Sequence, residues 1–390
     1  MNILFVTSSI KLFSGISFGA EVRSTLFVKA LSQIGHVDVV SFCKETVVSN
    51  IANCKVIYSS YIPKVKINSL LKRIIPIIIR PWSPYSYYQL NTIQHKIIQS
   101  VIENGKYDLV ACRYLSDAIS CGLLDFKSKL IIDIDDNPVT AYKRDRMSIS
   151  SNHGKGTLFQ WYKALNLGIM SRRVLRGVKC SFYSNPTEPP YNQSVFLHNV
   201  SLIKANSSGI TIDFPNRILF VGWLDYLPNK NGILHFVEKI FPTIKANVPD
   251  VELIVIGKTE DQSFINYLNS FEGIYAPGFV EDINEEYKKC RVIIIPIYQG
   301  SGTCIKFIEG MRVNRPIVST PMGARGFDRI CRDGVHYMRA ESDFCFAMKV
   351  TNLLNSIELS NQIAMQAMAI EKEFFSFDHF CNIVRDALCE

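Results

Sequence analysis

The sequence predicts an α/β protein with two domains, each a parallel sheet doubly wound by helices. Apolar strand segments alternate with helical segments along all 390 residues, which is the pattern of repeated βαβ units. A chain of this length exceeds one ordinary core and suits two domains of about 200 residues each. Hydrophobic residues make up 47% of the chain and charged residues 20%, as in globular proteins.

The expected strands fall into two sets. The first set comprises residues 3–7, 37–42, 109–112, 130–134, 180–184 and 194–197, and the second comprises residues 217–222, 252–256, 292–295, 317–319 and 335–338. The turn-rich segment 201–216 separates them. We therefore expect domains over residues 1–205 and 206–373, followed by a helical segment over residues 374–390.

A strand, a small-residue loop and a helix follow one another at residues 292–312. Ser301, Gly302 and Thr303 belong to the loop, and Lys306 and Glu309 to the helix. Glycines allow an anion to approach the backbone, while the free amides and the positive dipole end of the helix attract it. Glu309 lies two helical turns beyond the loop and can accept hydrogen bonds from the same ligand. The pattern predicts a phosphate site.

This segment resembles the donor-sugar signature of retaining glycosyltransferases of family 4, the glycosyl transferases group 1. Residues 309–318 match the second half of that signature, and Ser301 stands where the family usually has a first Glu, as in a subset with Gly-Ser-Gly-Thr-x-x-Lys. The resemblance implies the GT-B fold, in which two Rossmann-like domains face a central cleft. Residues 1–205 would then bind the acceptor, residues 206–373 the nucleotide-sugar donor, and helix 374–390 would cross back to the first domain.

The resemblance also implies further donor contacts. Gly19 belongs to a glycine-containing loop after the first strand, like the family loop that touches the donor diphosphate or the acceptor. Trp223 replaces the usual Arg of the diphosphate clamp, and Lys230 lies one residue before the usual Lys. Phe279 lies in a segment whose relatives contact the nucleotide base, although it is equally consistent with a core residue. Because the usual clamp is altered, we expect Lys306 to make the main diphosphate contact.

Carboxylates follow the expected strand 130–134. Asp133, Asp135 and Asp136 lie where the carboxyl end of a parallel strand meets the ligand crevice. The resemblance implies that Asp135 or Asp136 lies beside the anomeric carbon and the acceptor hydroxyl. Two alternatives stay open: the aspartates hold Mn²⁺ or Mg²⁺, or one of them caps the next helix. We prefer a metal-free site without any cofactor, because Lys306 and the helix start already supply positive charge.

The charge of the chain is divided unevenly. Residues 1–205 hold 25 Lys and Arg against 12 Asp and Glu, giving +13, whereas the rest holds 18 against 23, giving −5. The first half therefore suits an anionic partner, and no zinc-finger, RNP or helix-turn-helix pattern indicates nucleic acid. Residues 61–85 contain five basic residues, no acid and many apolar side chains, which suits an interfacial anchor on an anionic membrane. A buried helix with a charged edge explains this segment equally well.

Several features predict a cytoplasmic protein, with the basic segment bringing it to the inner face of the plasma membrane. The first residues form a strand and not a signal peptide, the eleven scattered cysteines suit a reducing compartment, and no apolar run is long enough to span a bilayer. We expect a retaining glycosyltransferase that moves a sugar from a nucleotide diphosphate-sugar to a hydroxyl of a bacterial cell-surface glycan, free or lipid-linked. The alternatives are a nucleotide-sugar epimerase and a non-catalytic nucleotide-sugar-binding protein.

Overall fold

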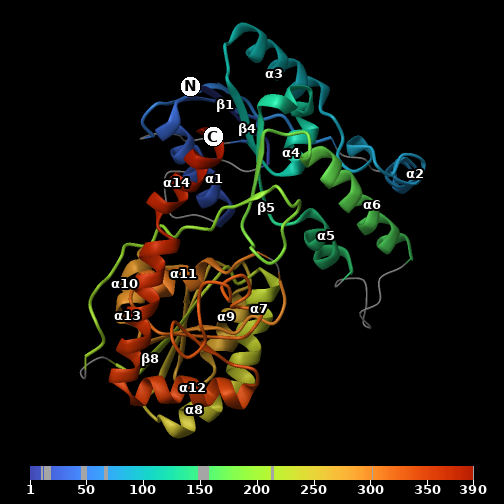
Figure 1. The fold of residues 1–390 in the computed structure, drawn as a ribbon. Helices are drawn as coiled ribbons and strands as arrows, with labels where there is room; N and C mark the ends of the chain where they lie inside the picture. Colours follow the sequence, from blue (N-terminus) through green and yellow to red (C-terminus); the bar gives the residue numbers. More distant parts are fainter. Residues whose placement is uncertain are drawn as a thin grey trace. The chain divides into compact units, whose positions relative to one another are not determined.

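The chain forms two compact units (Figure 1), one of residues 1–198 and 377–390 and one of residues 199–376. The computed structural model describes residues 1–9, 12, 19–44, 51–65, 69–147, 158–211, 215–300 and 302–389. Each unit contains one sheet whose strands all pair in parallel. The predicted α/β class with two doubly wound parallel sheets is therefore confirmed.

The first unit has a seven-stranded sheet in the order β3-β2-β1-β4-β5-β6-β7. The strands are β1 (Asn2–Thr7), β2 (His36–Ser41), β3 (Cys54–Ser59), β4 (Leu109–Arg113), β5 (Leu130–Asp135), β6 (Cys180–Tyr183) and β7 (Val195–Phe196). The strand order reverses between β1 and β4. In sheets of this kind, ligands bind outside the carboxyl ends of the strands at such a reversal.

The helices of the first unit include one from the far end of the chain. They are α1 (Gly19–Ile34), α2 (Leu70–Ile79), α3 (Thr92–Asn104), α4 (Leu115–Ser120), α5 (Pro138–Met147), α6 (Leu158–Leu175) and α14 (Phe377–Cys389), with the 3₁₀ helices η1 (Pro84–Ser86) and η2 (Leu123–Lys129). Helix α14 packs against α1, where the guanidinium of Arg23 lies 5.9 Å from the ring centroid of Phe380. The last helix of the chain thus completes the unit that the first strand begins.

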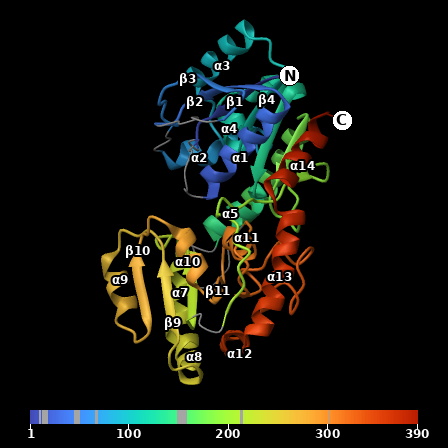
Figure 2. The same cartoon turned by 90° about the vertical axis from the view of Figure 1, so that its left-hand side faces the viewer.

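The second unit repeats the arrangement with six strands in the order β10-β9-β8-β11-β12-β13. Figure 2 labels β9, β10 and β11 of this sheet. The strands are β8 (Arg217–Val221), β9 (Glu252–Ile256), β10 (Ile274–Gly278), β11 (Val292–Ile295), β12 (Ile317–Ser319) and β13 (Met338–Arg339). The helices are α7 (Leu227–His235), the π-helical turn η3 (Phe236–Ile240), α8 (Phe241–Asn247), α9 (Gln262–Asn269), α10 (Ile283–Lys289), α11 (Ile305–Arg312), α12 (Asp343–Asn355) and α13 (Ile357–Phe374). The order reverses between β8 and β11.

Both faces of this second sheet are buried. Ile218 and Phe220 of β8 join the core on one face, and Leu219 between them joins the core on the other. Successive side chains of a strand point to opposite faces, so a sheet covered on both sides requires continuous apolar strands. Within the described parts of the chain, every helix is too short or too polar to cross a membrane.

The sequence prediction missed two strands, and two others are reduced to two residues each. β3 lies at the sheet edge, and its side chains alternate between partly buried and exposed, so it lacks the apolar run of a central strand. β10 is also an edge strand and contains Pro277 and Gly278, which weaken a strand signal. The strand predicted at residues 194–197 is reduced to Val195–Phe196 in β7. The strand predicted at residues 335–338 overlaps β13 (Met338–Arg339) at Met338 alone.

Candidate functional site

The predicted phosphate loop lies at the point of strand reversal in the second unit. It joins the end of β11 to the start of α11, and Gly300 and Gly302 have φ angles of +135° and +70°, which favour glycine. The first turn of α11 has no side-chain cap at Cys304, so its amides can donate to a ligand. The side-chain amide of Asn199 donates to Thr303 Oγ1 at 2.7 Å and holds the loop in place.

The ammonium of Lys306 lies at the centre of this site. Its Nζ donates to Asn229 Oδ1 at 2.9 Å and lies 4.3 Å from the ring centroid of Phe220. A Cβ atom at Gly222 would lie 2.9 Å from Nζ, so glycine at the end of β8 leaves the space that the ammonium occupies. Burial lowers the pKa of Lys306 to about 8, although Cys304 and Glu309 oppose the change. A partly buried cation with a lowered pKa is a strong candidate for binding an anion.

Glu309 lies one turn after Lys306 on the same helix and is partly buried. The Tyr287 hydroxyl from α10 donates to its Oε2 at 2.5 Å. Burial raises the pKa of Glu309, while the Tyr287 bond and Lys306 partly counteract the rise. A carboxylate in this position can accept hydrogen bonds from ligand hydroxyls.

The other predicted donor residues of the second unit are exposed or already engaged. Trp223 and Phe279 have exposed fractions of 47% and 71%, so the core interpretation of Phe279 is wrong. Lys230 Nζ forms an ion pair with Asp261 at 2.7 Å and lies 4.7 Å from the ring centroid of Phe264. The structure thus brings Gly222, Asn229 and Lys306 together and directs Lys230 toward Asp261.

Two predicted donor contacts belong to loops that the structure describes in part. Ser301 lies outside the described residues, as do residues 10, 11 and 13–18 of the predicted glycine loop. Gly19 is the first residue of α1. At the start of the same loop, Asp117 Oδ2 accepts from the amides of Ser8 and Ser9 at 3.1 and 2.9 Å, so these two amides are engaged within the protein.

The predicted carboxylates of the first unit are bound to two arginines. Asp133 is fully buried; its Oδ2 accepts from Arg23 Nε at 2.9 Å and lies 3.0 Å from Arg113 Nε. Asp135 pairs with Arg113 Nη2 at 2.6 Å and with Arg23 Nε at 3.7 Å. Burial would raise the pKa of Asp135, but the two guanidinium groups outweigh it and keep this pKa below its ordinary value. Asp135 therefore stays ionised near neutral pH.

This pairing bears on the metal interpretation. Asp133 and Asp135 have their charges balanced by Arg23 and Arg113 and do not form a surplus of negative charge for a cation. Within the described residues, no three His, Cys, Asp or Glu side chains are grouped as metal ligands would be. These carboxylates fit an ion-pair cluster better than a metal site.

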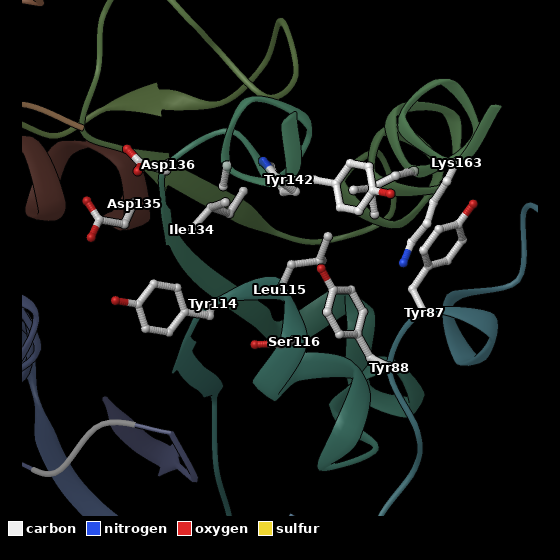
Figure 3. Close-up of a pocket in the computed structure, with 13 residues that line it drawn as sticks. Tyr87, Tyr88, Tyr114, Leu115, Ser116, Ile134, Asp135, Asp136, Tyr142 and Lys163 are labelled. Carbon is white, nitrogen blue, oxygen red and sulfur yellow. The ribbon is translucent and has the colours of Figure 1, made fainter. Parts of the chain in front are cut away.

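A pocket of about 460 Å³ opens beside Asp135 and Asp136 in the first unit (Figure 3). Asp135 has a left-handed φ of +67°, and the pairing of β5 with β6 shifts register between Asp133 and Asp135. A bulge of this kind turns the side chains at a strand end. Here the end of β5 contributes both Asp135 and Asp136 to the pocket lining.

Four tyrosines form a large part of the remaining pocket wall. Tyr87, Tyr88, Tyr114 and Tyr142 line it together with Lys163, whose Nζ lies 4.9 Å from the ring centroid of Tyr142 (Figure 3). Burial raises the pKa of Tyr88 to about 12, so its hydroxyl stays protonated and can donate. The volume and the mixture of rings with a few polar groups suit a small polar ligand such as one or two sugar rings.

Sequence reasoning missed the residues that complete both sites. Asn229 comes from α7 and Tyr287 from α10, while Arg23 and Arg113 come from α1 and the end of β4. A buried Arg inside an apolar strand, as at Arg113, was a signal that some buried carboxylate must lie nearby. Nothing in the sequence marked Asn229 or Tyr287.

Two doubly wound parallel sheets in one chain, with an anion-binding loop at the strand reversal of the second, define a GT-B architecture. Residues 215–356 match the family model described as Glycosyl transferases group 1. A Klebsiella pneumoniae protein described as an uncharacterized 44.6 kDa protein in the cps region is 23% identical over 299 residues, which cover 73% of this chain and 75% of that protein.

Solved structures resemble the whole chain. HepE from Anabaena in complex with UDP and glucose has a TM-score of 0.66 at 15% identity, covering 100% of this chain and 99% of its own. Sucrose-phosphate synthase from Thermosynechococcus elongatus has a TM-score of 0.66 at 12% identity, covering 99% and 97%. The chain is a glycosyltransferase with the GT-B fold, and its second unit carries the group 1 match.

Proposed function

We propose that the protein is a retaining glycosyltransferase that moves a sugar from a nucleoside diphosphate-sugar to a hydroxyl of a glycan acceptor. The observation that carries this proposal is the environment of Lys306. Its ammonium is partly buried beside Gly222, Asn229 and the phosphate-type loop, and its pKa is lowered to about 8. A cation that is costly to bury is retained where an anionic ligand compensates for it.

Different residues of the donor site bind different parts of the donor. Lys306 and the amides of Gly302 and Thr303 hold the diphosphate, and the start of α11 adds its dipole. Glu309, positioned by Tyr287, accepts from a ribose or sugar hydroxyl. The exposed rings of Trp223 and Phe279 offer surfaces for the nucleotide base, and Lys230 contributes a peripheral contact.

The acceptor site is the tyrosine-lined pocket of the first unit, with Asp135 and Asp136 beside the attacking hydroxyl. Asp135 stays ionised through Arg113 and Arg23 and is therefore a weak base that orients the acceptor. The sugar leaves with front-face geometry. Lys306 stabilises the departing diphosphate, and a diphosphate oxygen takes the proton of the incoming hydroxyl, so no enzyme nucleophile or divalent metal is required.

The comparisons guide the choice of substrates. HepE was solved with UDP and glucose, so uridine diphosphate-sugars are the first donors to test. The cps region relative supports a role in bacterial cell-surface polysaccharide biosynthesis, in the cytoplasm, where nucleotide sugars are made. The base, the sugar and the linkage are open to direct assay.

The test is an incubation of the purified protein with a panel of nucleoside diphosphate-sugars, followed by NMR spectroscopy. Slow donor hydrolysis that releases the sugar first as the anomer of the donor supports a retaining transferase. Release of the opposite anomer contradicts retention. A changed sugar configuration identifies an epimerase instead, and tight nucleotide binding without turnover identifies a binding protein.

A further inference from the structure

An apolar stripe of α2 is exposed on the first unit. Leu71, Ile75, Ile78 and Ile79 are exposed by 46% to 68%, whereas Ile77 is buried. The exposed residues are spaced i, i+4, i+7 and i+8, so they lie on one face of the helix. The interpretation of residues 61–85 as a buried helix is therefore wrong for this face.

The start of α6 carries a second exposed apolar stripe that the sequence analysis did not detect. Leu158, Trp161 and Leu165 are exposed by 90%, 53% and 67%. Ala164 and Leu167 on the other side of the helix are buried. The helix is thus apolar on both sides, and only one side is covered by the protein core.

The two stripes belong to elements that contact each other. The Tyr162 hydroxyl of α6 donates to the carbonyl of Ile77 in α2 at 3.5 Å. The Arg173 guanidinium of α6 lies 4.8 Å from the ring centroid of Trp82, which follows α2. We call the exposed apolar residues of α2 and α6, together with Trp82, the docking surface. Figure 1 labels the two helices that carry it.

The two segments that carry the docking surface contain basic residues and no acidic ones. Lys72, Arg73 and Arg80 on or next to α2 are exposed, as is Arg173 on α6. Neither residues 61–85 nor residues 158–175 contain an Asp or Glu. Lys64 pairs with Asp117 at 3.6 Å. Exposed apolar and aromatic side chains bordered by cations match the chemistry of an anionic bilayer surface.

The same elements also build the tyrosine-lined pocket. Lys163 and Leu167 of α6 line it, and Tyr87 and Tyr88 follow Trp82 by one 3₁₀ turn. A ligand in the pocket is therefore held by the helix that bears the second apolar stripe. A saccharide carried on a membrane lipid would meet both features at once.

We propose that the docking surface binds an anionic membrane and that the adjacent pocket takes the saccharide head group of a lipid-linked acceptor. The acceptor half of this statement rests on the proposed transferase function, but the membrane half does not. Lys163 lies where it meets a phosphate that joins such a saccharide to its lipid.

The membrane half is tested by sedimentation with vesicles of phosphatidylcholine, with and without phosphatidylglycerol. The parent protein should bind only the anionic vesicles at low ionic strength and leave them as salt rises. Changing Lys72, Arg80 and Arg173 together to Gln should weaken binding about 100-fold, since each basic residue contributes about fivefold. Changing the exposed Lys239, Lys289 and Lys372 of the second unit to Gln should leave vesicle binding within about threefold of the parent value.

The apolar stripes are tested separately. Leu71, Ile79 and Leu165 changed together to Ser should weaken vesicle binding by at least about tenfold. The matched control changes Ile93, Phe344 and Met365, which are exposed by 60% to 71% elsewhere, to Ser and should bind as the parent does. Thermal melting and nucleotide binding confirm that each variant is folded.

Three outcomes overturn the proposal. The first is a parent protein that does not bind anionic vesicles. The second is a variant with Ser at the three apolar positions that sediments with vesicles as the parent does. The third is a concentration-dependent dimer that the apolar variant abolishes, which would assign the surface to a second copy of the chain. Equal transfer to a free glycan and to its lipid-linked form would refute the acceptor half alone. Failure of donor hydrolysis would refute the transferase and leave the vesicle result standing.

Discussion

Replacing Lys306 with Met should weaken nucleoside diphosphate binding while leaving the fold intact. Met keeps the apolar stem that crosses the Phe220 ring and removes the ammonium that donates to Asn229. A charge-assisted hydrogen bond to phosphate contributes about 1.5 to 3 kcal/mol. The dissociation constant should therefore rise about 10-fold to 150-fold.

The pH dependence of nucleotide affinity provides a second test of the role of Lys306. With a pKa of about 8, Lys306 is mainly protonated at pH 7 and loses its proton as the pH rises. A bound diphosphate favours the protonated form and raises this pKa, so the affinity of the parent should be constant below pH 8. Above pH 8 it should fall by up to about tenfold per pH unit. The Lys306→Met variant should lack this fall.

The Lys306→Met variant should bind the nucleotide more weakly than the parent but be more stable against unfolding. Burial lowers the pKa of Lys306 from 10.5 to about 8, which corresponds to at most about 3 kcal/mol against the charged form in the folded protein. Loss of the bond to Asn229 offsets part of this gain, so the net increase in unfolding free energy should be about 1 kcal/mol at pH 7. Between pH 8 and 10.5 the unfolded parent binds more protons, so its stability rises and the variant's advantage should vanish.

Isothermal titration with UDP from pH 6.5 to 9.5 and urea denaturation measure the two effects. Lys289→Met, on the exposed side of α10, is the matched control and should match the parent in affinity. An unchanged dissociation constant for Lys306→Met, or a parent affinity that is flat to pH 9.5, would refute the assignment of Lys306 to the diphosphate.

Three further outcomes are expected. Gly222→Ala should weaken UDP binding at least about fivefold without unfolding the protein, because the new methyl group would lie 2.9 Å from the Lys306 ammonium; unchanged titration isotherms would contradict this. Arg113→Met leaves one guanidinium for the fully buried Asp133 and the partly buried Asp135, so it should lower the unfolding free energy by about 3 to 5 kcal/mol. Urea curves measure this against an Arg332→Met control at an exposed arginine. Donor hydrolysis should persist in excess EDTA, because a lysine and a helix dipole stabilise the leaving diphosphate; its loss, with recovery on adding Mn²⁺, would establish a metal-dependent reaction.

The features of the donor site that lie within a short stretch of sequence could be predicted. The loop, Lys306 and Glu309 occupy ten residues, and one strand, one turn and one helix fix their relative positions. Their spacing alone places them together. The strands of both sheets were visible for the same reason, except where β3 and β10 lie at an edge and lack a continuous apolar run.

Contacts between distant segments could not be predicted. Asn229 and Tyr287 reach α11 from helices that start 78 and 22 residues before it. Neither residue type is unusual in a helix, so neither signals a contact. The exposed stripe of α6 was hidden for another reason, because a helix that is apolar on both sides gives no amphipathic pattern.

Helix α14 is far from α1 in the sequence but packs against it in the same unit. Phe380, Cys381, Val384 and Leu388 of this helix are buried, and α14 packs against α1 in the unit that contains β1. A growing polypeptide emerges from the ribosome in sequence order, so residues 199–376 are complete before α14 appears. The face of residues 1–198 that packs against α14 therefore stays uncovered while residues 199–376 are synthesised, and it reaches its final packing only after residues 377–389 have left the ribosome.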